Sequence, residues 1–456
     1  MSSQVSSKTY DVIVIGSGPA GGIVARQCAD AGLTVAVAER DGWGGVCPLR
    51  GCEPKKTLAD MAHEVVRVRD MAAHGVAGDV HVDWRALMRF KHSVIDPISD
   101  KVLHSFTRRG VDILDGEASF AGPDAVAVEG HGTFTARNIV VATGAVPRSL
   151  GIPGEELLLT SDRFLDLEDL PESLLFIGGG FISFEFACIA AAAGARATIL
   201  HRSRRVLKGF DESLSEKLVQ AMEAQGVAVH VDHPVKAVEP FEGGVRVLAS
   251  GPDGVDMEFV AAAAVSGAGR VPDLDGLNLD AAGVRFDRRG IAVDETLRSL
   301  SNPNVFAAGD CAEPGHPLTP VAVLQAATVV RNILEPGSAR SDLSGTAGAV
   351  FTHPVLACAG LLEEQAREKR LDFKVYEGDA ARWSEHERLG MAHAGYRVLV
   401  ENSTGRILGA HYLGAHAEEV VNIFGLAIRH GLTREDLLAQ PWAYPSFGYT
   451  LRYMLG

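Results

Sequence analysis

Two cysteines lie five positions apart in the stretch GGVCPLRGCEPKK, residues 44–56. Thiols at this spacing could form a structural disulfide, supply half of a metal site, or act as a redox pair. A zinc site would need two more close ligands and usually has a shorter inner spacing. Because no Cys-His cluster accompanies Cys47 and Cys52 in the sequence, we expect no metal site here.

The spacing of these cysteines also constrains the backbone between them. In a regular helix, residues five apart are separated by about 7.5 Å along the axis, whereas a disulfide joins Cα atoms at most about 7 Å apart. A bridge therefore implies a distorted backbone, and Pro48 and Gly51 lie between the two thiols. Strained or exposed disulfides are the reducible ones, which favours a redox pair. A following helix N-terminus would also lower the pKa of a thiol.

Composition and charge limit the class of protein. The chain has 456 residues, 46% of them hydrophobic, and a net charge of −15, which suits several domains with large cores. An acidic chain does not attract nucleic acid or anionic lipid through its overall field, and no apolar run reaches the roughly 18 residues of a membrane span. The polar opening MSSQVSSKTY predicts neither a signal nor a transit peptide. We therefore expect a cytoplasmic protein without nucleic-acid or membrane partners, in which six cysteines form no disulfide framework.

A first glycine motif predicts a dinucleotide site near the start of the chain. Residues 12–15 form a continuous apolar run, as in a parallel strand covered on both faces. Gly16, Gly18 and Gly21 follow in the pattern G-x-G-x-x-G, and Glu39 ends the next apolar strand. Glycines let the backbone approach a pyrophosphate, the helix N-terminus supplies positive dipole, and the acid accepts from a ribose hydroxyl. The alternative is an ordinary tight turn between strand and helix.

The same pattern recurs in LLFIGGGFISFEFACIAAAAGARATILHRSRR, residues 174–205. Gly178 and Gly180 are in place, while Ser183 takes the third small position. The second strand ends in basic residues rather than in an acid. A carboxylate would repel a 2′-phosphate, whereas arginine can bind one bidentately, so the motif favours NADPH unless these cations only form a solvated basic turn. The candidate cations are Arg202, Arg204, Arg205 and Lys208.

Later segments complete the predicted architecture. NVFAAGD, residues 304–310, predicts a short buried strand, and DLPESL at 169–174 predicts a linker into the second dinucleotide domain. From about residue 347, alternating strands are followed by helices. We expect an α/β protein with two Rossmann-like dinucleotide-binding domains and a separate α+β domain.

These motifs together resemble a known family. The cysteine stretch, VVATGAVPR (140–148), SGAGRVPD (266–273), PLTPVAVLQA (317–326) and FTHPVLACAGLLEEQA follow in the order seen in class I pyridine nucleotide-disulfide oxidoreductases. This family includes glutathione reductase, dihydrolipoamide dehydrogenase and mercuric reductase. The resemblance covers essentially the whole chain. It implies an FAD-binding domain at 1–150, an NAD(P)-binding domain at 151–275, a central domain completing the FAD site at 276–346, and a dimerisation domain at 347–456.

The resemblance also implies a mechanism and a set of site residues. Hydride passes from NADPH, with NADH less favoured, to FAD and then to a Cys47–Cys52 disulfide in a homodimer. Cys52 is the flavin-facing thiol and Cys47 the interchange thiol, while Lys55 lies beside the flavin with Glu185 as its ion-pair partner. For Phe181, core packing is the alternative to a nicotinamide lid, and for Asp310 a turn at a strand end. The implied cofactor-binding residues are Gly16, Gly18, Ala20, Gly21, Glu39, Val46, Lys55, Thr143, Gly144, Asp310, Thr319, Gly178, Gly180, Phe181, Ile182, Arg202, Lys208 and Gly269.

The C-terminal segment QPWAYPSFGYTLRYML departs from the family pattern. Disulfide-reducing members carry a His-Pro dipeptide followed by a glutamate, whereas this chain has Tyr444 before Pro445 and Tyr449 at the glutamate position. A tyrosine, with an ordinary pKa of about 10, is a poor proton shuttle at neutral pH, so Tyr444 is either catalytic or an interface-packing residue. Mercuric reductase shares the tyrosine but usually has a C-terminal cysteine pair, whereas the last cysteine here is Cys358.

The substrate positions favour a disulfide other than glutathione. Arg26 agrees with a family arginine near the substrate, but Val102 and Ala327 stand where glutathione reductases place a tyrosine and a second arginine. Our leading hypothesis is an NADPH-dependent flavoenzyme that reduces a low-molecular-weight thiol disulfide. The alternatives are a reductase of quinones or other acceptors, a mercuric-type or dihydrolipoamide dehydrogenase-like enzyme, and a flavin-binding redox sensor.

Overall fold

The computed structural model describes residues 5–313 and 315–456, so part of the polar opening, from which no targeting segment is predicted, lies outside the described residues. The chain forms two compact units. The first unit comprises Met1–Pro54, Phe90–Arg148 and Arg270–Leu343, and the second comprises Lys55–Arg89, Ser149–Gly269 and Ser344–Gly456.

A seven-stranded sheet forms the centre of the first unit. Four strands run parallel to their neighbours, in the order β3 (Asp112–Asp115), β2 (Val35–Glu39), β1 (Val5–Ile15) and β6 (Gly132–Val141), and β18 (Val305–Ala307) pairs with β6. β5 (Ala125–Val128) and β4 (Ala118–Gly122) extend it as antiparallel strands. The central segments of the parallel strands are apolar and buried, among them the predicted run Val12–Ile15 in β1, Val35–Ala38 in β2 and Ile139–Val141 in β6.

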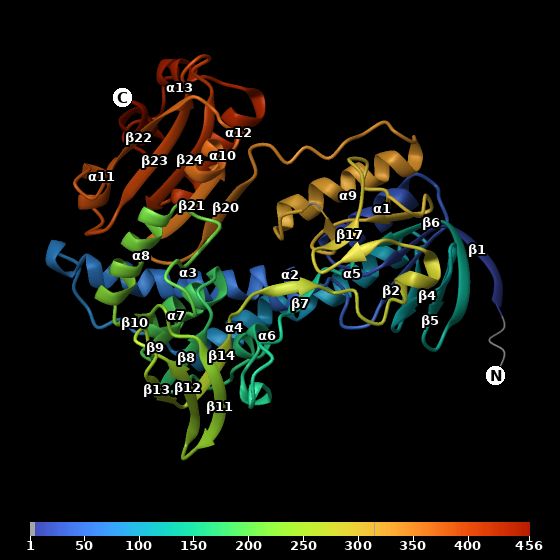
Figure 1. Cartoon of the computed structure of the whole chain (residues 1–456), viewed down its shortest axis with the longest axis horizontal. Coiled ribbons are helices and arrows are strands. Elements are labelled where there is room, and N and C mark those ends of the chain that lie inside the picture. Colours follow the sequence, from blue (N-terminus) through green and yellow to red (C-terminus); the bar gives the residue numbers. More distant parts are fainter. Residues whose placement is uncertain (1–4, 314) are drawn as a thin grey trace. The chain divides into compact units, whose positions relative to one another are not determined.

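Helices of the first unit pack around this sheet. α1 (Pro19–Asp30) lies against α9 (Thr319–Leu334), as Figure 1 shows, and α5 (Pro97–Thr107) contacts both α1 and β3. The short strands β7 (Ala145–Pro147) and β15 (Arg270–Pro272) pair antiparallel, and β16 (Phe286–Asp287), β17 (Gly290–Ala292) and β19 (Ala312–Glu313) form a small sheet. Two further helices are α2 (Val46–Arg50) and α4 (Trp84–Ile95), the latter crossing the boundary between the units.

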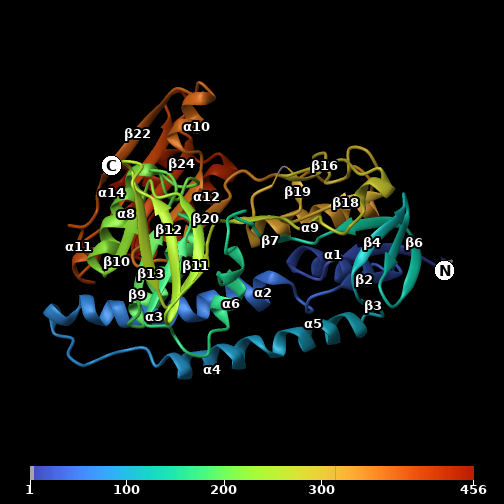
Figure 2. The same ribbon diagram turned by 60° about the horizontal axis from the view of Figure 1, so that its bottom comes forward.

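The second unit contains the second dinucleotide fold. Its parallel sheet has the order β10 (Val227–His230), β9 (Arg196–Leu200), β8 (Ser173–Ile177) and β14 (Ala263–Ser266). α7 (Phe181–Ala192) and α8 (Glu212–Ala224) connect these strands. The antiparallel strands β11 (Val235–Phe241), β12 (Gly244–Ser250) and β13 (Asp256–Ala261) form a separate sheet, visible in Figure 2. β8 begins at Ser173, so the predicted linker at 169–174 is wrong in its last two residues, which pair with β9 instead.

A five-stranded antiparallel sheet forms the C-terminal part of the second unit. α12 (Ala417–His430) packs on it through a buried face that includes Val420, Val421 and Phe424. The strands lie in the order β20 (Ala347–Val350), β21 (Val355–Gly360), β24 (Ile407–Gly414), β23 (Gly395–Glu401) and β22 (Phe373–Asp379). The other helices are α3 (Cys52–Asp70), α10 (Glu363–Glu368), α11 (Ser384–Glu387), α13 (Arg434–Ala439) and α14 (Leu451–Leu455). The predicted α/β class, with two Rossmann-like folds and an α+β region, is confirmed.

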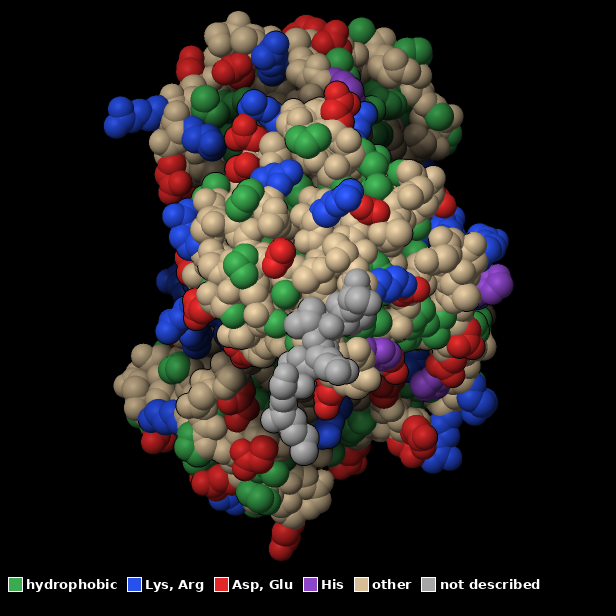
Figure 3. All heavy atoms as spheres, turned by 90° about the vertical axis from the view of Figure 1, so that its right-hand side faces the viewer, with side chains coloured by type: hydrophobic (Ala, Val, Ile, Leu, Met, Phe, Trp, Pro, Cys, Tyr) green, Lys and Arg blue, Asp and Glu red, His purple; other side chains and the backbone are tan. Residues whose placement is uncertain are grey.

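The surface carries charges of both signs. On the face that Figure 3 shows, acidic and basic side chains are interspersed rather than gathered by sign. Within the described ranges, no helix combines the length and the apolar character needed to cross a bilayer.

Ser183 at the third small position of the second glycine motif is accommodated by a glycine opposite it. A Cβ added to Gly267, which follows β14, would lie 2.0 Å from Ser183 Oγ. Ser183 is fully buried, so its hydroxyl cannot move into solvent. The helix therefore reaches the sheet closely because residue 267, rather than residue 183, lacks a side chain.

This packing generates a stability prediction. Gly267→Ala should lower the free energy of unfolding by about 1–3 kcal/mol, because the added methyl group overfills the helix–strand contact. Adding Ser183→Gly should recover most of the loss, since the clash is with the serine hydroxyl. Thermal melts of the FAD-loaded protein measure both effects, with Gly209→Ala, at a site with open space, as the control. Equal loss in the single and double variants would contradict this account.

Candidate active site

The turn between β1 and α1 is built for close approach of a ligand. Gly16 has φ +99°, and a Cβ there would lie 2.4 Å from the carbonyl oxygen of Ala142. Gly21 lies so close to Gly16 that a Cβ would meet its carbonyl oxygen at 1.9 Å. Gly18 is the N-cap of α1 and offers no side chain to its free N–H groups. Such a helix N-terminus is suited to a pyrophosphate.

Glu39 is held rigidly at the end of β2. Its Oε2 accepts hydrogen bonds from Ser17 N (2.9 Å) and Ser17 Oγ (2.7 Å), and its Oε1 accepts from Arg40 N and Asp41 N, both at 2.9 Å. These four donors fix the carboxylate beside the glycine turn, where a ribose would lie in a dinucleotide complex.

Buried polar atoms near β6 and β18 lack partners within the described part of the chain. These are Thr143 Oγ1 and Gln325 Nε2, although Gln325 Oε1 accepts from Gly309 N at 2.8 Å. Burial raises the pKa of the neighbouring Asp310. Unsatisfied buried polar groups need an explanation, and a polar cofactor such as FAD at this turn supplies one. Gln325 was missed by the sequence analysis, although it lies inside the motif PLTPVAVLQA.

The two cysteines meet because the helix breaks between them. α2 ends at Arg50, Gly51 adopts φ −137° and ψ −111°, and α3 begins at Cys52. A Cβ on Gly51 would lie 3.0 Å from Val46 O and 3.2 Å from Cys47 Cα. The backbone distortion expected from the spacing of the cysteines is therefore present, and it depends on a close approach at Gly51.

Both thiols contact one hydroxyl group. Thr319 Oγ1, on the first residue of α9, donates to Cys47 Sγ at 3.0 Å and lies 3.5 Å from Cys52 Sγ. The two sulfurs also lie within hydrogen-bond reach of each other. A hydrogen bond with Cys52, followed by burial, raises the pKa of Cys47 above that of an ordinary cysteine, against the lowering effect of Thr319. Cys47 therefore holds its proton firmly in this arrangement.

Lys55 and Glu185 form a buried ion pair in the second unit. Lys55 Nζ lies 2.9 Å from Glu185 Oε1 and 4.1 Å from the centre of the Phe351 ring. Glu185 is 2% exposed and also accepts a hydrogen bond from Phe351 N at 2.8 Å. Removing one partner of such a pair leaves a buried charge, which typically costs about 3–5 kcal/mol. The sequence paired Lys55 with Glu185 but gave no sign of Phe351.

The second glycine turn repeats the features of the first. Gly178 has φ +125°, and a Cβ there would meet Gly267 O at 2.4 Å. Gly180 is the N-cap of α7 without a capping side chain. Phe181 is 45% exposed, so it does not fill the core of this unit. The turn therefore fits a second dinucleotide.

The cations after β9 differ in their partners. Arg202, Arg204 and Lys208 are exposed and make no ion pair with any described residue. Arg205 is instead paired with Glu364, at 2.7 Å. Three of the four candidate cations are thus free to meet a 2′-phosphate.

The tyrosines that replace histidine and glutamate contact one another. The Tyr444 and Tyr449 rings lie 4.9 Å apart with an interplanar angle of 69°, and Tyr444 is 69% exposed.

The residues at the predicted substrate positions lie in the first unit. Arg26 is half-buried over the Phe106 ring, and burial lowers its pKa. Val102 packs against the core of that unit, as its apolar side chain requires.

The sequence-predicted residues divide between the units. Cys47 and Cys52 are in the first unit, and Glu185 and Tyr444 in the second. Of the cofactor-binding candidates, the first unit holds Gly16, Gly18, Ala20, Gly21, Glu39, Val46, Thr143, Gly144, Asp310 and Thr319, and the second holds Lys55, Gly178, Gly180, Phe181, Ile182, Arg202, Lys208 and Gly269.

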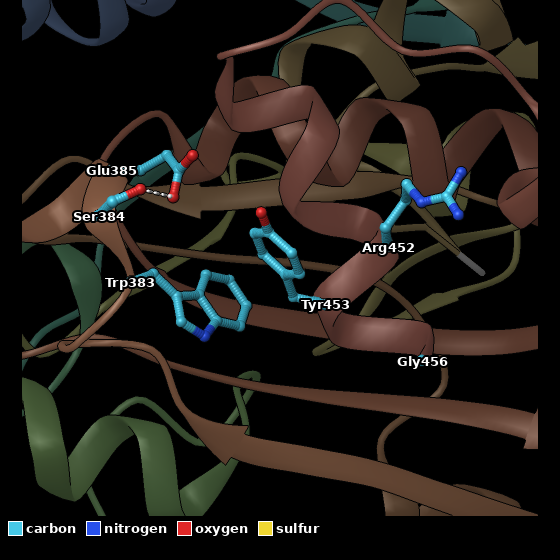
Figure 4. A pocket seen from close by; sticks show the side chains of 6 residues that line it. All are labelled: Trp383, Ser384, Glu385, Arg452, Tyr453 and Gly456. Atoms are coloured by element: carbon cyan, nitrogen blue, oxygen red, sulfur yellow. Dashed lines mark hydrogen bonds between the residues drawn. The ribbon is translucent and has the colours of Figure 1, made fainter.

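A separate cavity of about 410 Å³ lies beside α11 and α14 in the second unit (Figure 4). Ser384 Oγ donates to Glu385 there, and the Trp383 and Tyr453 rings lie 5.4 Å apart. Its lining contains neither a cysteine nor a glycine motif, so it is not part of the redox site. Across the described residues, no three His, Cys, Asp or Glu side chains are placed to hold a metal ion.

Comparison with known proteins agrees with this geometry. The family model for pyridine nucleotide-disulphide oxidoreductases matches residues 10–326, and the model for their dimerisation domain matches residues 346–454. Glutathione reductase of Burkholderia cepacia is 34% identical over 441 residues, covering 96% of each chain. Dihydrolipoyl dehydrogenase of Bacillus subtilis (strain 168) is 31% identical over 448 residues, covering 96% of this chain and 94% of the relative.

A solved structure shares the whole fold. The HOCl-induced flavoprotein disulfide reductase RclA from Escherichia coli matches with a TM-score of 0.87 at 27% identity, covering 98% of this chain and 99% of that one. The predicted FAD and NADPH are the cofactors of this family, and the predicted oxidoreductase class is confirmed. The chain therefore belongs to the pyridine nucleotide-disulphide oxidoreductase family, whose members are flavoprotein enzymes that act on sulfur groups.

Proposed function

We propose that this protein is a homodimeric, FAD-dependent enzyme that uses NADPH to reduce the disulfide of a low-molecular-weight thiol. The observation that carries the proposal is the meeting of Cys47 and Cys52 at the Thr319 hydroxyl, in the unit that holds the first glycine turn. A quinone reductase would not need both thiols, whereas a redox sensor that reports through the same pair would oxidise NADPH slowly with every acceptor.

The proposed reaction is two steps of thiol–disulfide exchange. The Cys47 thiolate attacks one sulfur of the substrate, forms a mixed disulfide and releases the first thiolate, which takes up a proton. The Cys52 thiolate then attacks Cys47 Sγ, closes the Cys47–Cys52 disulfide and releases the second thiolate. Two electrons from NADPH, carried by bound FAD, reduce this disulfide again. Thr319 orients both sulfurs, and the pair Lys55–Glu185 supplies a fixed positive charge for electron transfer.

The substrate class follows from the residues that glutathione reductases use and this chain lacks. Val102 and Ala327 provide neither a phenol nor a guanidinium for a glutathione carboxylate. Arg26 remains as the one arginine of that set, and it is half-buried. We therefore assign a disulfide with fewer carboxylates than glutathione disulfide.

A second candidate is reduction of a metal ion by the same thiol pair. It is favoured by a solved Cu(II) complex of RclA, 26% identical to this chain with a TM-score of 0.87. It is disfavoured by the absence, among the residues described, of a third ligand group near the thiols. In an NADPH-oxidation screen over disulfides, quinones, Cu(II) and Hg(II), we expect the highest kcat/KM for a disulfide.

The roles of the two cysteines are tested by single substitutions. Cys47→Ser should lower disulfide reduction by several decades, because the attacking thiolate is lost. The protein should then show a long-wavelength absorption band from the Cys52 thiolate beside the flavin, and NADPH oxidation with a quinone should continue. Cys52→Ser should lack the band. A band that survives in Cys52→Ser would reverse the assignment.

The preference for NADPH is tested at the exposed cations. Arg202→Ala should reduce the NADPH-to-NADH ratio of kcat/KM by about one to two decades, since a charge-assisted contact contributes about 1.5–3 kcal/mol. Adding Lys208→Ala should reduce the ratio further. Arg196→Ala, an exposed arginine at the start of β9, is the matched control and should leave the ratio unchanged. Equal kcat/KM values for the two nucleotides in the wild type would refute the preference.

Tyr444 is tested through the pH dependence of disulfide reduction. Because the pKa of Cys47 is raised, its thiolate is scarce at neutral pH, and kcat/KM should rise by about tenfold per pH unit as the pH increases from 7 to 9. Tyr444→Phe should lower kcat/KM by only about tenfold, the net worth of one hydrogen bond, and keep the same slope. Loss of several decades together with a basic-limb pKa would show instead that Tyr444 is the proton donor.

A further inference from the structure

The loop that carries the coenzyme-selecting cations is held by the dimerisation region of the same unit. This coenzyme loop, residues 201–211, connects β9 to α8 and bears Arg202 and Lys208. Its anchors lie on α10 and β23, more than 150 residues further along the chain. Both segments belong to the second unit.

Arg205 is the first anchor point. Its guanidinium faces the Glu364 carboxylate through two hydrogen bonds, Nη1 to Oε2 at 2.7 Å and Nη2 to Oε1 at 3.1 Å. Nη2 also donates to the Phe210 carbonyl oxygen at 3.3 Å. The hydrogen bonds with Glu364 raise the pKa of Arg205 and lower that of Glu364. The polar face of this arginine is directed at the dimerisation region and its own loop, not at solvent.

Asp211 at the end of the loop is the second anchor point. Arg397 Nε lies 3.1 Å from Asp211 Oδ2, and Arg397 also pairs with Glu363 and Glu377. Asp211 Oδ1 caps α8 by accepting from Leu214 N at 3.2 Å. One carboxylate thus ties the start of α8 to the arginine of β23, and both charges are largely buried, with side chains 10% and 19% exposed.

The contact between Arg205 and Glu364 fixes the loop more than it stabilises the fold. Glu364 is 50% exposed and Arg205 is 24% exposed, so this pair contributes little to global stability. A bidentate pair nevertheless imposes a direction on both side chains. Arg202 lies between β9 and Arg205, and Lys208 lies between Arg205 and Asp211. Without these contacts, both cations would lose more conformational freedom on binding a phosphate.

We propose that Glu364 and Arg397 are specificity-determining positioning residues, which hold the coenzyme loop in the form that binds a 2′-phosphate. We call the Arg205–Glu364 and Asp211–Arg397 contacts the clamp. Within it, Arg205 is held by Glu364 and is not a phosphate ligand. The inference rests on the proposed use of NADPH, and it assigns to α10 and β23 a role in coenzyme choice besides their place in the dimerisation region.

The test is direct binding of two nucleotide fragments to the FAD-loaded protein by calorimetry. Adenosine 2′,5′-bisphosphate carries the selecting phosphate, whereas 5′-AMP lacks it, and neither requires turnover. Glu364→Gln should weaken binding of the bisphosphate by about tenfold and change that of 5′-AMP by less than twofold. Arg205→Met should have the same effect, and the double variant should be no worse, because both changes open one clamp.

Matched variants separate the clamp from a general loss of structure. Glu368→Gln lies on the same helix, is exposed, and should bind both fragments as the wild type does. Arg397→Met should also weaken the bisphosphate selectively. An equal loss for both fragments would make these residues merely structural and overturn the inference.

Other outcomes would overturn it in a different way. Tighter binding of the bisphosphate by Glu364→Gln would show that Arg205 is a phosphate ligand that Glu364 restrains. Unchanged selectivity in Glu364→Gln and Arg397→Met, with a selective wild type, would refute the clamp alone. A wild-type protein that binds the two fragments equally would refute the NADPH proposal together with this inference.

Discussion

The second unit depends on the ion pair and the hydrogen bond that the buried carboxylate of Glu185 forms. A carboxylate that is 2% exposed must be paired and hydrogen-bonded, and its partners come from two distant segments. Lys55 arrives from α3, and the N–H of Phe351 from the connection between β20 and β21. The dinucleotide fold of this unit, the helix that follows the cysteines and the start of the dimerisation region are therefore joined at one oxygen atom. The position of the Lys55 charge relative to α7 is fixed by the same contacts.

The sequence predicted those features that local backbone chemistry determines. The two glycine turns follow from strands and helices that are adjacent in the chain, and the fold class follows from the turns. A distorted backbone between Cys47 and Cys52 was also expected for a redox pair, because their spacing is too long for a bridge across a regular helix. Each of these inferences uses residues within about one supersecondary unit of one another.

Contacts between distant segments could not be predicted in this way. Arg205 has the same charge as Arg202 and Lys208, and only Glu364, 159 residues away, separates its role from theirs. Phe351 contributes a backbone N–H to Glu185, and a backbone donor has no sequence signature. Gln325 belongs to a motif that was noticed, but its unsatisfied Nε2 is visible only when its burial is known.

In the proposed reaction, the environment of Cys47 and the residue at position 444 both concern proton transfer. Proximity to Cys52 and burial keep Cys47 protonated, and a solvent-exposed phenol replaces the histidine that would protonate the leaving thiolate. Loss of general acid catalysis typically costs about 10²–10⁴-fold. This loss of rate affects substrates whose leaving thiols have an ordinary pKa, because a thiol of lower pKa can leave as a thiolate without a proton donor. We therefore expect the preferred disulfide to be one whose thiols are more acidic than an ordinary cysteine thiol, which agrees with a binding site that lacks the second arginine of glutathione reductases.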